Sequence, residues 1–267
     1  MRLVKGLLER CVEVTELMAG GAGPQRLSDI AQALDLPKSA THRLLRELCA
    51  QGWMAQDDAD GPYRLTLRFG LLGHRVLLGI GLVDLTQPLL QHLADRTREL
   101  ARLTVATGDG LVWLASAQGA PPGLMYQPSM DGAPVLHATA NGKAFLATLE
   151  DAAALRLARH GGLGAQRPTR HTLATNAALL ADLTRIRVRG YATADQEAEL
   201  GVTAVAVAIR GTGGTAVGTV SVAGPSLRVS TSRIAELAAA LAETARALAS
   251  VWPSHPPYRT AAQKGHA

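Results

Sequence analysis

The feature that most constrains the fold of this chain is a tight corner, Asp35-Leu36-Pro37, between two short helical patterns. Before the corner, Ser28 is expected to cap a short helix whose apolar face is formed by Ile30, Ala31 and Leu34. After the corner, a further helix is expected to run to about Gln51, because proline is favoured at the first helical position and Gly52 would end the helix. Two short helices joined this closely indicate a helix-turn-helix.

The flanking sequence extends this pattern in both directions. An amphipathic helix is predicted over about residues 3–18, and the Gly- and Pro-rich residues 20–24 end it. Two strand-like segments, 53–56 and 63–66, flank the turn sequence Asp-Asp-Ala-Asp-Gly-Pro at 57–62, which predicts a hairpin. Three short helices followed by a hairpin is the order of a winged helix. We therefore expect residues 1–66 to form a winged helix-turn-helix DNA-binding domain.

The helix after the corner has one apolar side and one polar side. Ala40, Leu44 and Leu48 recur every four residues and are expected to face the core. The polar residues on its first turns have donors suited to phosphates and base edges, and they are Lys38, Ser39, Thr41, His42, Arg43 and Arg46. A solvated polar face on an ordinary helix is the alternative, but the corner and the hairpin favour DNA binding. Arg43 is the expected base contact and Lys38 the expected phosphate contact, and Arg64 of the hairpin is added to the DNA-binding set.

Composition permits this function without demanding it. The chain has 27 basic and 22 acidic residues and a net charge of +5, but residues 1–75 carry almost no excess charge, so DNA binding depends on local placement. Aromatic residues make up 3 % of the chain, which offers few stacking platforms for single-stranded nucleic acid. Cys11 and Cys49 are expected to be buried thiols without a disulfide or a metal, as in a reducing cytosol. We expect a cytoplasmic protein with no signal peptide and no membrane span.

The rest of the chain mixes helices and strands. A Leu-rich linker helix is predicted over 67–82, with an apolar surface broad enough to suggest a partner chain. Residues 83–252 are predicted to form an effector-binding domain, and the tail 253–267 is predicted to be disordered. Within that domain we expect helices at 85–100, 140–149, 152–160, 176–190 and 232–251, and strands at 103–106, 111–115, 124–126, 202–209 and 216–223. Hairpins combined with helices predict an α+β fold with an antiparallel sheet.

Several motifs resemble those of the IclR-type transcriptional regulators. The segment Leu36–Leu45 resembles the helix-turn-helix of that family, and Leu136–Ala147 resembles its "LHxTAxGKAxLA" run. Residues 190–202 resemble its "GYA…DxE…GV" segment, and residues 218–225 its last core strand. The resemblance covers nearly the whole chain and implies a winged helix, a linker helix, a GAF-like effector domain, and dimers or dimers of dimers. Ala208 stands where the family usually has a proline, and Gln196 stands where it often has a second acid. Both departures concern the shape and charge of the pocket and not the fold.

The effector site is predicted from the residues and from the resemblance together. Thr139 is expected to cap the helix that begins at Ala140, leaving the N–H groups of Asn141 and Gly142 free for an anion, with Gly142 allowing a ligand to approach closely. The alternative is that Thr139 only caps the helix and Gly142 only packs, and that neither residue contacts a ligand. By resemblance, the other pocket walls are Asp195, Glu197, Val202, Thr203, Ala204, Ser221 and Ala223. Strand alternation places only part of this set on one face, and the two acids could instead cap a loop.

These observations predict a DNA-binding transcriptional regulator, a repressor rather than an activator, controlled by a small organic or aromatic acid. The expected partners are double-stranded operator DNA, the effector and a second copy of the chain. No nucleophile–base set, metal-ligand spacing or cofactor motif is visible, and the glycines at 211–214 precede a strand rather than the helix that a dinucleotide site requires. An enzyme acting on a small acid and a ligand-independent DNA-binding protein are the alternatives.

Overall fold

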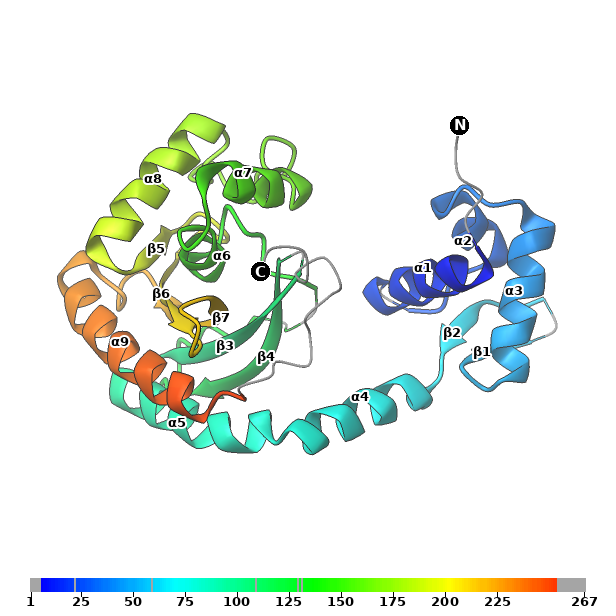
Figure 1. Ribbon diagram of the computed structural model, residues 1–267, viewed down its shortest axis with the longest axis horizontal. Coiled ribbons are helices and arrows are strands. Elements are labelled where there is room, and N and C mark those ends of the chain that lie inside the picture. The colour runs from blue at the N-terminus through cyan, green and yellow to red at the C-terminus, as the bar shows by residue number, and fades with distance from the viewer. Residues whose placement is uncertain are drawn as a thin grey trace. The chain divides into compact units, whose positions relative to one another are not determined.

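The computed structural model describes residues 6–253 except Ala22, Ala59, Asp109, Ser129 and Asp131, and gives no side chains for Leu77, Leu78 and Ile80. The chain divides into two compact units, Met1–Gly79 and Ile80–Ala267. Figure 1 labels the elements of both units, and each unit is described by itself.

The first unit contains four helices and a hairpin among its described residues. Its elements are α1 (Leu7–Gly20), α2 (Leu27–Ala33), α3 (Lys38–Ala50), β1 (Met54–Gln56), β2 (Tyr63–Leu65) and α4 (Leu67–Ile80). Strands β1 and β2 pair antiparallel, and Gln25 adds an isolated bridge to Tyr63. The buried core of the unit consists of Val14, Met18, Ile30, Leu44, Leu45, Met54 and Tyr63. The predicted order of three short helices and a hairpin is confirmed.

The turn between α2 and α3 is built around one strained residue. Asp35 adopts a left-handed backbone with φ of 53°, and the Leu36 N–H donates to the Ala31 carbonyl at 2.9 Å, which closes the corner. Pro37 is the N-cap of α3. The predicted cap at Ser28 is wrong, because α2 begins at Leu27 and the Ser28 hydroxyl donates to its neighbour Asp29.

The second unit is an antiparallel sheet covered by helices. Its elements are α5 (Leu82–Thr97), β3 (Leu100–Thr107), β4 (Gly110–Gln118), α6 (Ala140–Leu146), α7 (Asp151–His160), α8 (Asn176–Arg189), β5 (Ala192–Asp195), β6 (Val202–Arg210), β7 (Ala216–Pro225), the 3-10 turn η1 (Thr231–Arg233) and α9 (Ile234–Val251). The five strands lie in the order β4-β3-β7-β6-β5, and every neighbouring pair is antiparallel. The predicted α+β fold with an antiparallel sheet is confirmed.

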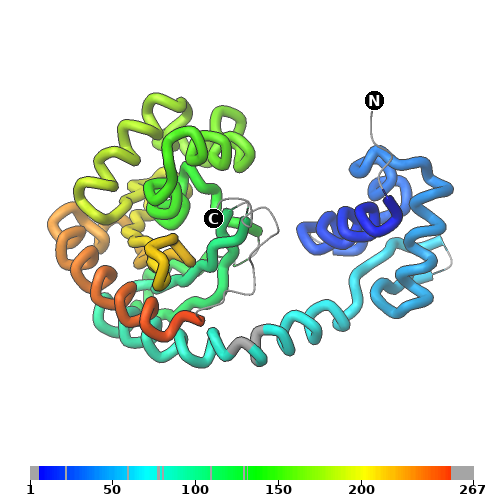
Figure 2. The backbone as a smooth tube through the Cα atoms, in the orientation of Figure 1, coloured from blue at the N-terminus to red at the C-terminus, as the bar shows by residue number. Residues whose placement is uncertain are grey.

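Strand alternation gives the sheet two different faces. Helices α5 and α9 run side by side on one face, as Figures 1 and 2 both show, and pack on alternate aliphatic residues such as Leu103, Val205 and Val222. Helices α6, α7 and α8 cover the other face, where Ala192 and Ala206 lie among their buried contacts. The α6 side carries small and polar strand residues, so it is the face on which a ligand site could be built.

Some boundaries differ from the sequence prediction. Leu100 was expected at the end of a helix, but α5 ends at Thr97 because Arg98 turns left-handed with φ of 58°, and Leu100 begins β3. The strand predicted at 124–126 is wrong, since these residues have no regular structure. Strand β5 was not predicted. The tail from residue 254 onward lies outside the described residues, and none of the described helices is long and apolar enough to cross a membrane.

Candidate functional site

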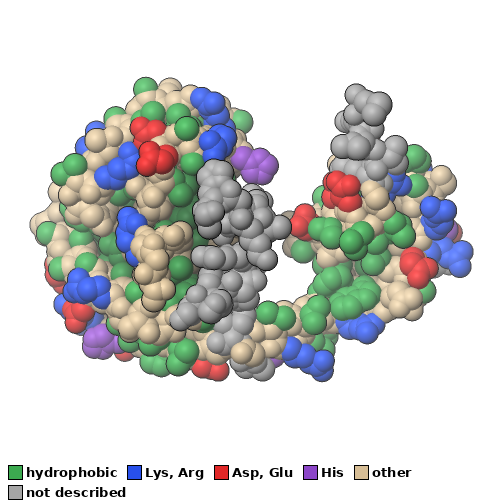
Figure 3. All heavy atoms as spheres, viewed as in Figure 1, with side chains coloured by type: hydrophobic (Ala, Val, Ile, Leu, Met, Phe, Trp, Pro, Cys, Tyr) green, Lys and Arg blue, Asp and Glu red, His purple; other side chains and the backbone are tan. Residues whose placement is uncertain are grey.

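Helix α3 presents a polar, cationic side to solvent. Thr41, Leu44 and Leu45 form its buried side, while Lys38, Ser39, His42, Arg43 and Arg46 are exposed. Figure 3 shows basic side chains gathered along the margin of the first unit over α3. No ion pair within 4.0 Å joins Lys38, Arg43 or Arg46 to an acid among the described residues. These cations are therefore available to an external polyanion.

One predicted DNA contact is wrong. Thr41 is fully buried, and its hydroxyl donates to the Pro37 carbonyl at 3.1 Å, one turn earlier in the chain. The four-residue spacing predicts an inner side formed by Ala40, Leu44 and Leu48. The structure buries Thr41, Leu44 and Leu45 instead, so the buried side is rotated towards Thr41 and Leu45. Ala40 is half-buried. The other five predicted α3 residues lie on the outer side.

The hairpin holds its predicted cation in an ion pair. The Arg64 Nε donates to the Asp57 carboxylate at 2.7 Å, and half of the Arg64 side chain remains exposed. The Asp57 N–H donates to the Pro62 carbonyl at 3.2 Å, which closes the turn. Because the pair is open to solvent and weak, Arg64 could leave Asp57 for a phosphate at little cost.

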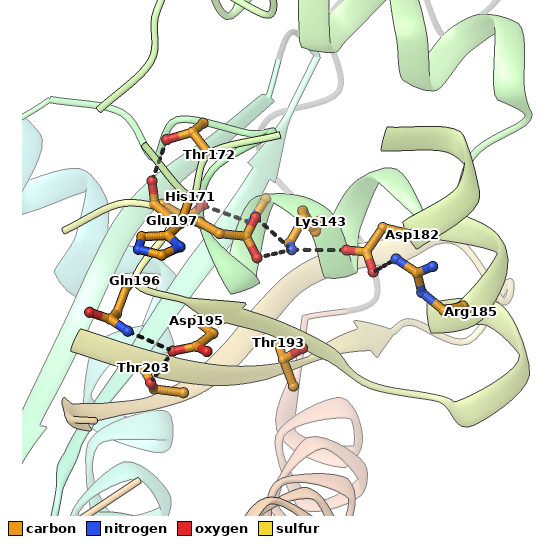
Figure 4. A network of polar contacts seen from close by, with 12 residues as sticks. Lys143, His171, Thr172, Asp182, Arg185, Thr193, Asp195, Gln196, Glu197 and Thr203 are labelled. Atoms are coloured by element: carbon orange, nitrogen blue, oxygen red, sulfur yellow. Dashed lines mark hydrogen bonds and ion pairs between the residues drawn. The ribbon is translucent and has the colours of Figure 1, made fainter. Parts of the chain in front are cut away.

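In the second unit, a buried lysine organises the predicted ligand region (Figure 4). The Lys143 Nζ donates to both carboxylate oxygens of Glu197 at 2.7 and 2.8 Å and lies 2.9 Å from a carboxylate oxygen of Asp182. The Lys143 side chain is 1 % exposed. Burial raises the pKa of Glu197, opposed by Lys143, whereas for Asp182 burial is outweighed by Lys143 and Arg185, and the pKa is lowered. Glu197 and Lys143 thus neutralise each other, and Glu197 is not free to hold a ligand.

The loop that carries Glu197 is fixed by side-chain hydrogen bonds to its backbone. The Thr169 hydroxyl donates to the Gln196 carbonyl and the Thr172 hydroxyl donates to the Glu197 carbonyl, both at 2.6 Å. The Gln196 side-chain oxygen accepts from the Gly201 N–H at 3.1 Å. Glutamine at this position therefore has a structural role that an acid could also fill.

One of the two predicted N–H groups at the start of α6 is already used within the chain. The Thr139 hydroxyl caps the helix as expected, but it does so by accepting from the Gly142 N–H at 3.1 Å. A Cβ on Gly142 would lie 2.3 to 2.6 Å from the backbone of Leu136. Packing within the chain therefore requires the glycine, and the prediction that Gly142 lets a ligand approach closely is wrong. The Asn141 amide points at the sheet and donates to the Thr219 hydroxyl at 2.9 Å.

The predicted strand residues divide between the two faces of the sheet. Ala204, Ser221 and Ala223 lie on the α6 side, and Val202 has the same parity. Thr203 lies on the α5–α9 side with Val205, and its hydroxyl donates to the Asp195 carboxylate at 3.0 Å. Asp195 and Thr203 pair across β5 and β6, so neither shares a face with Ser221. Their assignment to one pocket with Ser221 is wrong.

The sequence reasoning missed a buried cation on the α6 side of the sheet. Arg102 of β3 is 8 % exposed, and its guanidinium lies 3.8 Å from the centre of the Trp113 ring. Arg102 is the register partner of Ser221, and both Arg102 Nε and Ser221 Oγ are buried without a hydrogen-bond partner. The signal in the sequence was an arginine inside the alternating run Leu100–Thr107, at a position of the same parity as the polar Thr104.

Two family models match this chain. Residues 74–250 match the family model described as "Bacterial transcriptional regulator IclR C-terminal", and residues 7–58 match "IclR helix-turn-helix domain". The chain belongs to the IclR family of transcriptional regulators. Because both family models and the relatives describe regulators, this IclR-family protein is a regulator and not an enzyme.

Individual relatives of this IclR-family protein match it over nearly its whole length. The HTH-type transcriptional regulator BhcR of Paracoccus denitrificans is 34 % identical over 242 residues, which cover 90 % of this chain and 85 % of BhcR. The transcriptional repressor IclR of Escherichia coli K12 is 29 % identical over 240 residues, 90 % of this chain and 87 % of the repressor. An IclR homolog from Microbacterium hydrocarbonoxydans, solved in complex with 4-hydroxybenzoate, shares the fold at a TM-score of 0.72 and 24 % identity, covering 92 % of this chain and 99 % of that one.

Proposed function

We propose that this regulator binds operator DNA through the exposed side of α3 and represses transcription until a small organic acid binds the second unit. The observation that carries the DNA-binding part is the outward set of Lys38, Ser39, His42, Arg43 and Arg46 beside a buried helix side, within a helix-turn-helix of the IclR family. Arg43 is assigned to a base edge, Lys38 to a phosphate, and Arg64 of the hairpin to the flanking backbone.

Ligand binding is assigned to the α6 side of the sheet in the second unit. Ala140 and Asn141 of α6 and Ala204, Ser221 and Ala223 of the strands bring small and polar groups to this side. The Microbacterium hydrocarbonoxydans homolog, which shares the fold, was solved with 4-hydroxybenzoate, an aromatic acid. An organic acid is therefore the class of effector that we assign to this chain.

Dimer formation is assigned to apolar surface of the first unit. Hydrophobic side chains are exposed over α1 and α4 (Figure 3), and they are Leu7, Leu8, Val12, Leu67, Leu71, Leu72 and Val76. A group of exposed apolar side chains on two helices of one unit indicates a protein interface. Two copies would place two α3 helices in successive major grooves of a palindromic operator, about 34–36 Å apart. The Escherichia coli relative is named a repressor, which favours repression for this cytoplasmic regulator.

Selection of DNA from a random duplex library by the full-length protein tests this function. We expect enrichment of a palindromic sequence, and we expect that variants at Arg43 and Lys38 lose affinity for it. An organic acid that binds the second unit should then lower operator affinity, by no more than the ratio of its affinities for the free and DNA-bound protein. A library that shows no enriched sequence would refute the DNA-binding assignment.

A further inference from the structure

Arg102 is a buried cation that the DNA-binding function does not use. It lies on β3, on the α6 side of the sheet, and is 8 % exposed. The Trp113 ring supports one face of its guanidinium at 3.8 Å, and the Tyr126 ring lies 6.0 Å away. Stacking on a face leaves the edge of the guanidinium, with its N–H donors, as the part that can bind a partner.

The donors around Arg102 are not fully satisfied. Arg102 Nε and Ser221 Oγ are buried without a hydrogen-bond partner, although most buried polar atoms have one. The two residues are directly opposite on β3 and β7, which puts their Cβ atoms about 5 Å apart on the same face. In the next row of the sheet, the Thr219 hydroxyl is hydrogen-bonded to the Thr104 hydroxyl and to the Asn141 amide. The polar side chains of that row are therefore satisfied within the chain.

Within the part of the chain that the structure describes, no acid forms an ion pair with Arg102 within 4.0 Å. Tyr126 and Glu199 are the groups whose charge acts to raise the pKa of Arg102, and neither forms an ion pair with it. Burial lowers the pKa of Arg102, as expected for a cation that lacks a counter-charge. A buried charge of this kind is costly unless an anion pairs with it.

Lys143, a fully buried cation of this unit, cannot serve the same purpose. Its ammonium is already shared between Glu197 and Asp182. Among the described residues, the α6 side of the sheet therefore offers one positive charge without an ion pair, one unpartnered N–H donor and one unpartnered hydroxyl donor. This set matches a singly charged carboxylate, whose two oxygens accept from two donors, rather than a doubly charged phosphate.

We propose that Arg102 and Ser221 are the anchoring pair that binds the carboxylate of the effector, which is a small monocarboxylic acid. The Arg102 Nε–H and the Ser221 O–H each donate to the carboxylate, and the guanidinium neutralises its charge. This inference rests on the proposed ligand-binding function of the second unit. It differs from the anion site predicted at the start of α6, where the Thr139 hydroxyl already accepts from the Gly142 N–H.

Binding of paired acids and amides to the full-length protein tests the inference. The probes are benzoate, 4-hydroxybenzoate, pyruvate and acetate, each compared with its neutral amide by titration calorimetry. The variants are Arg102→Gln, which removes the charge, and Ser221→Ala, which removes only the hydroxyl. Arg156→Gln is the matched control, because Arg156 is an exposed arginine of α7. Affinity for the selected operator without any acid is measured for every protein.

We expect at least one acid to bind and its amide to bind at least about tenfold more weakly. Arg102→Gln should weaken acid binding by about 10- to 100-fold and Ser221→Ala by roughly 2- to 10-fold, while Arg156→Gln should leave it unchanged. If Arg102→Gln does not fold, Ser221→Ala and the acid–amide comparison still decide.

Three results would overturn the inference: equal binding of acid and amide, acid binding retained by the folded Arg102→Gln variant, or no binding of any of the four acids. These outcomes are separate from failure of the proposed function. A wild-type protein that selects an operator and responds to neutral compounds alone would keep the proposed function and lose this inference. A wild-type protein that selects no operator would lose the DNA-binding function whatever the acids do.

Discussion

Lys143 binds both carboxylate oxygens of Glu197 at 2.7 and 2.8 Å, although 54 residues separate them along the chain. Asp182 of α8 completes the group at 2.9 Å, so one ammonium ties α6 to α8 and to the loop after β5. Since the lysine is 1 % exposed and the acids 10 and 12 %, water cannot replace the missing partner if one is removed. The group is therefore a structural centre of the second unit.

Replacing Lys143 with methionine should destabilise the second unit by about 3–5 kcal/mol, because two buried carboxylates would lose their counter-charge. Arg185→Gln is the control, since Arg185 touches the same Asp182 but is 64 % exposed and should cost less than about 1 kcal/mol. Urea unfolding of both variants measures the difference. Equal losses of stability would show that the buried ammonium is not the main stabilising contact of the group.

Replacing Arg43 with alanine should weaken binding to the selected operator by about 1–3 kcal/mol and relax the preference at one base pair. Thr41→Val is the matched change on the same helix, because Thr41 is buried and its hydroxyl is bonded within α3. We expect Thr41→Val to keep operator affinity per folded molecule. Fluorescence anisotropy titrations measure both, and a larger loss for Thr41→Val would contradict the orientation of α3.

Replacing Gly142 with alanine should cost about 1–3 kcal/mol of folding stability whether or not a ligand is present, because its Cβ would collide with the Leu136 backbone. Gly70→Ala in α4 is the opposite case: no atom lies within 4 Å of its new Cβ, so stability should rise by about 0.5–1 kcal/mol. Thermal unfolding compares the two. An unchanged midpoint for Gly142→Ala, with loss of acid binding, would restore the ligand-contact interpretation.

Replacing Leu71 of α4 with aspartate should convert the proposed dimer into a monomer and reduce operator affinity, because a charge would be placed in an apolar interface. Leu71 is 58 % exposed in the single chain, so its substitution costs little within one copy. Val188→Asp, at an 86 % exposed valine of α8, is the control. Sedimentation velocity over a range of concentrations reports the mass, and a Leu71→Asp protein that remains dimeric would exclude this surface.

The Tyr126 hydroxyl should titrate at high pH. Burial raises the pKa of Tyr126 to about 12, with Arg102 opposing the rise. A pKa that is higher in the folded than in the unfolded state means that Tyr126 stabilises the fold below about pH 10, and that this contribution is lost as pH rises towards 12. Unfolding midpoints of wild type and Tyr126→Phe between pH 9 and 12 test this. The wild type should lose stability faster, and parallel curves would contradict the shifted pKa.

Several features of this protein follow from short stretches of sequence. The corner Asp35-Leu36-Pro37 predicts a helix-turn-helix because a left-handed residue and a proline act on the backbone locally. Alternation in the runs 202–210 and 216–225 predicts strands because successive side chains point to opposite faces. The polar residues of α3 were predicted as a set because they share one helix, and Thr139 was correctly predicted as a cap because its partner lies three residues away.

Tertiary structure alone decided which side chains meet. Thr41 is buried because of the way α3 packs on the neighbouring elements. A four-residue spacing in the sequence does not fix which side of the helix is buried to better than half a turn. Thr203 and Ser221 lie on opposite faces because the register of β6 against β7 sets their parity. The unpaired donors of Arg102 and Ser221 exist because β3 and β7, more than one hundred positions apart, are neighbours in the sheet. Such contacts depend on long-range pairing, and no local pattern of residues specifies it.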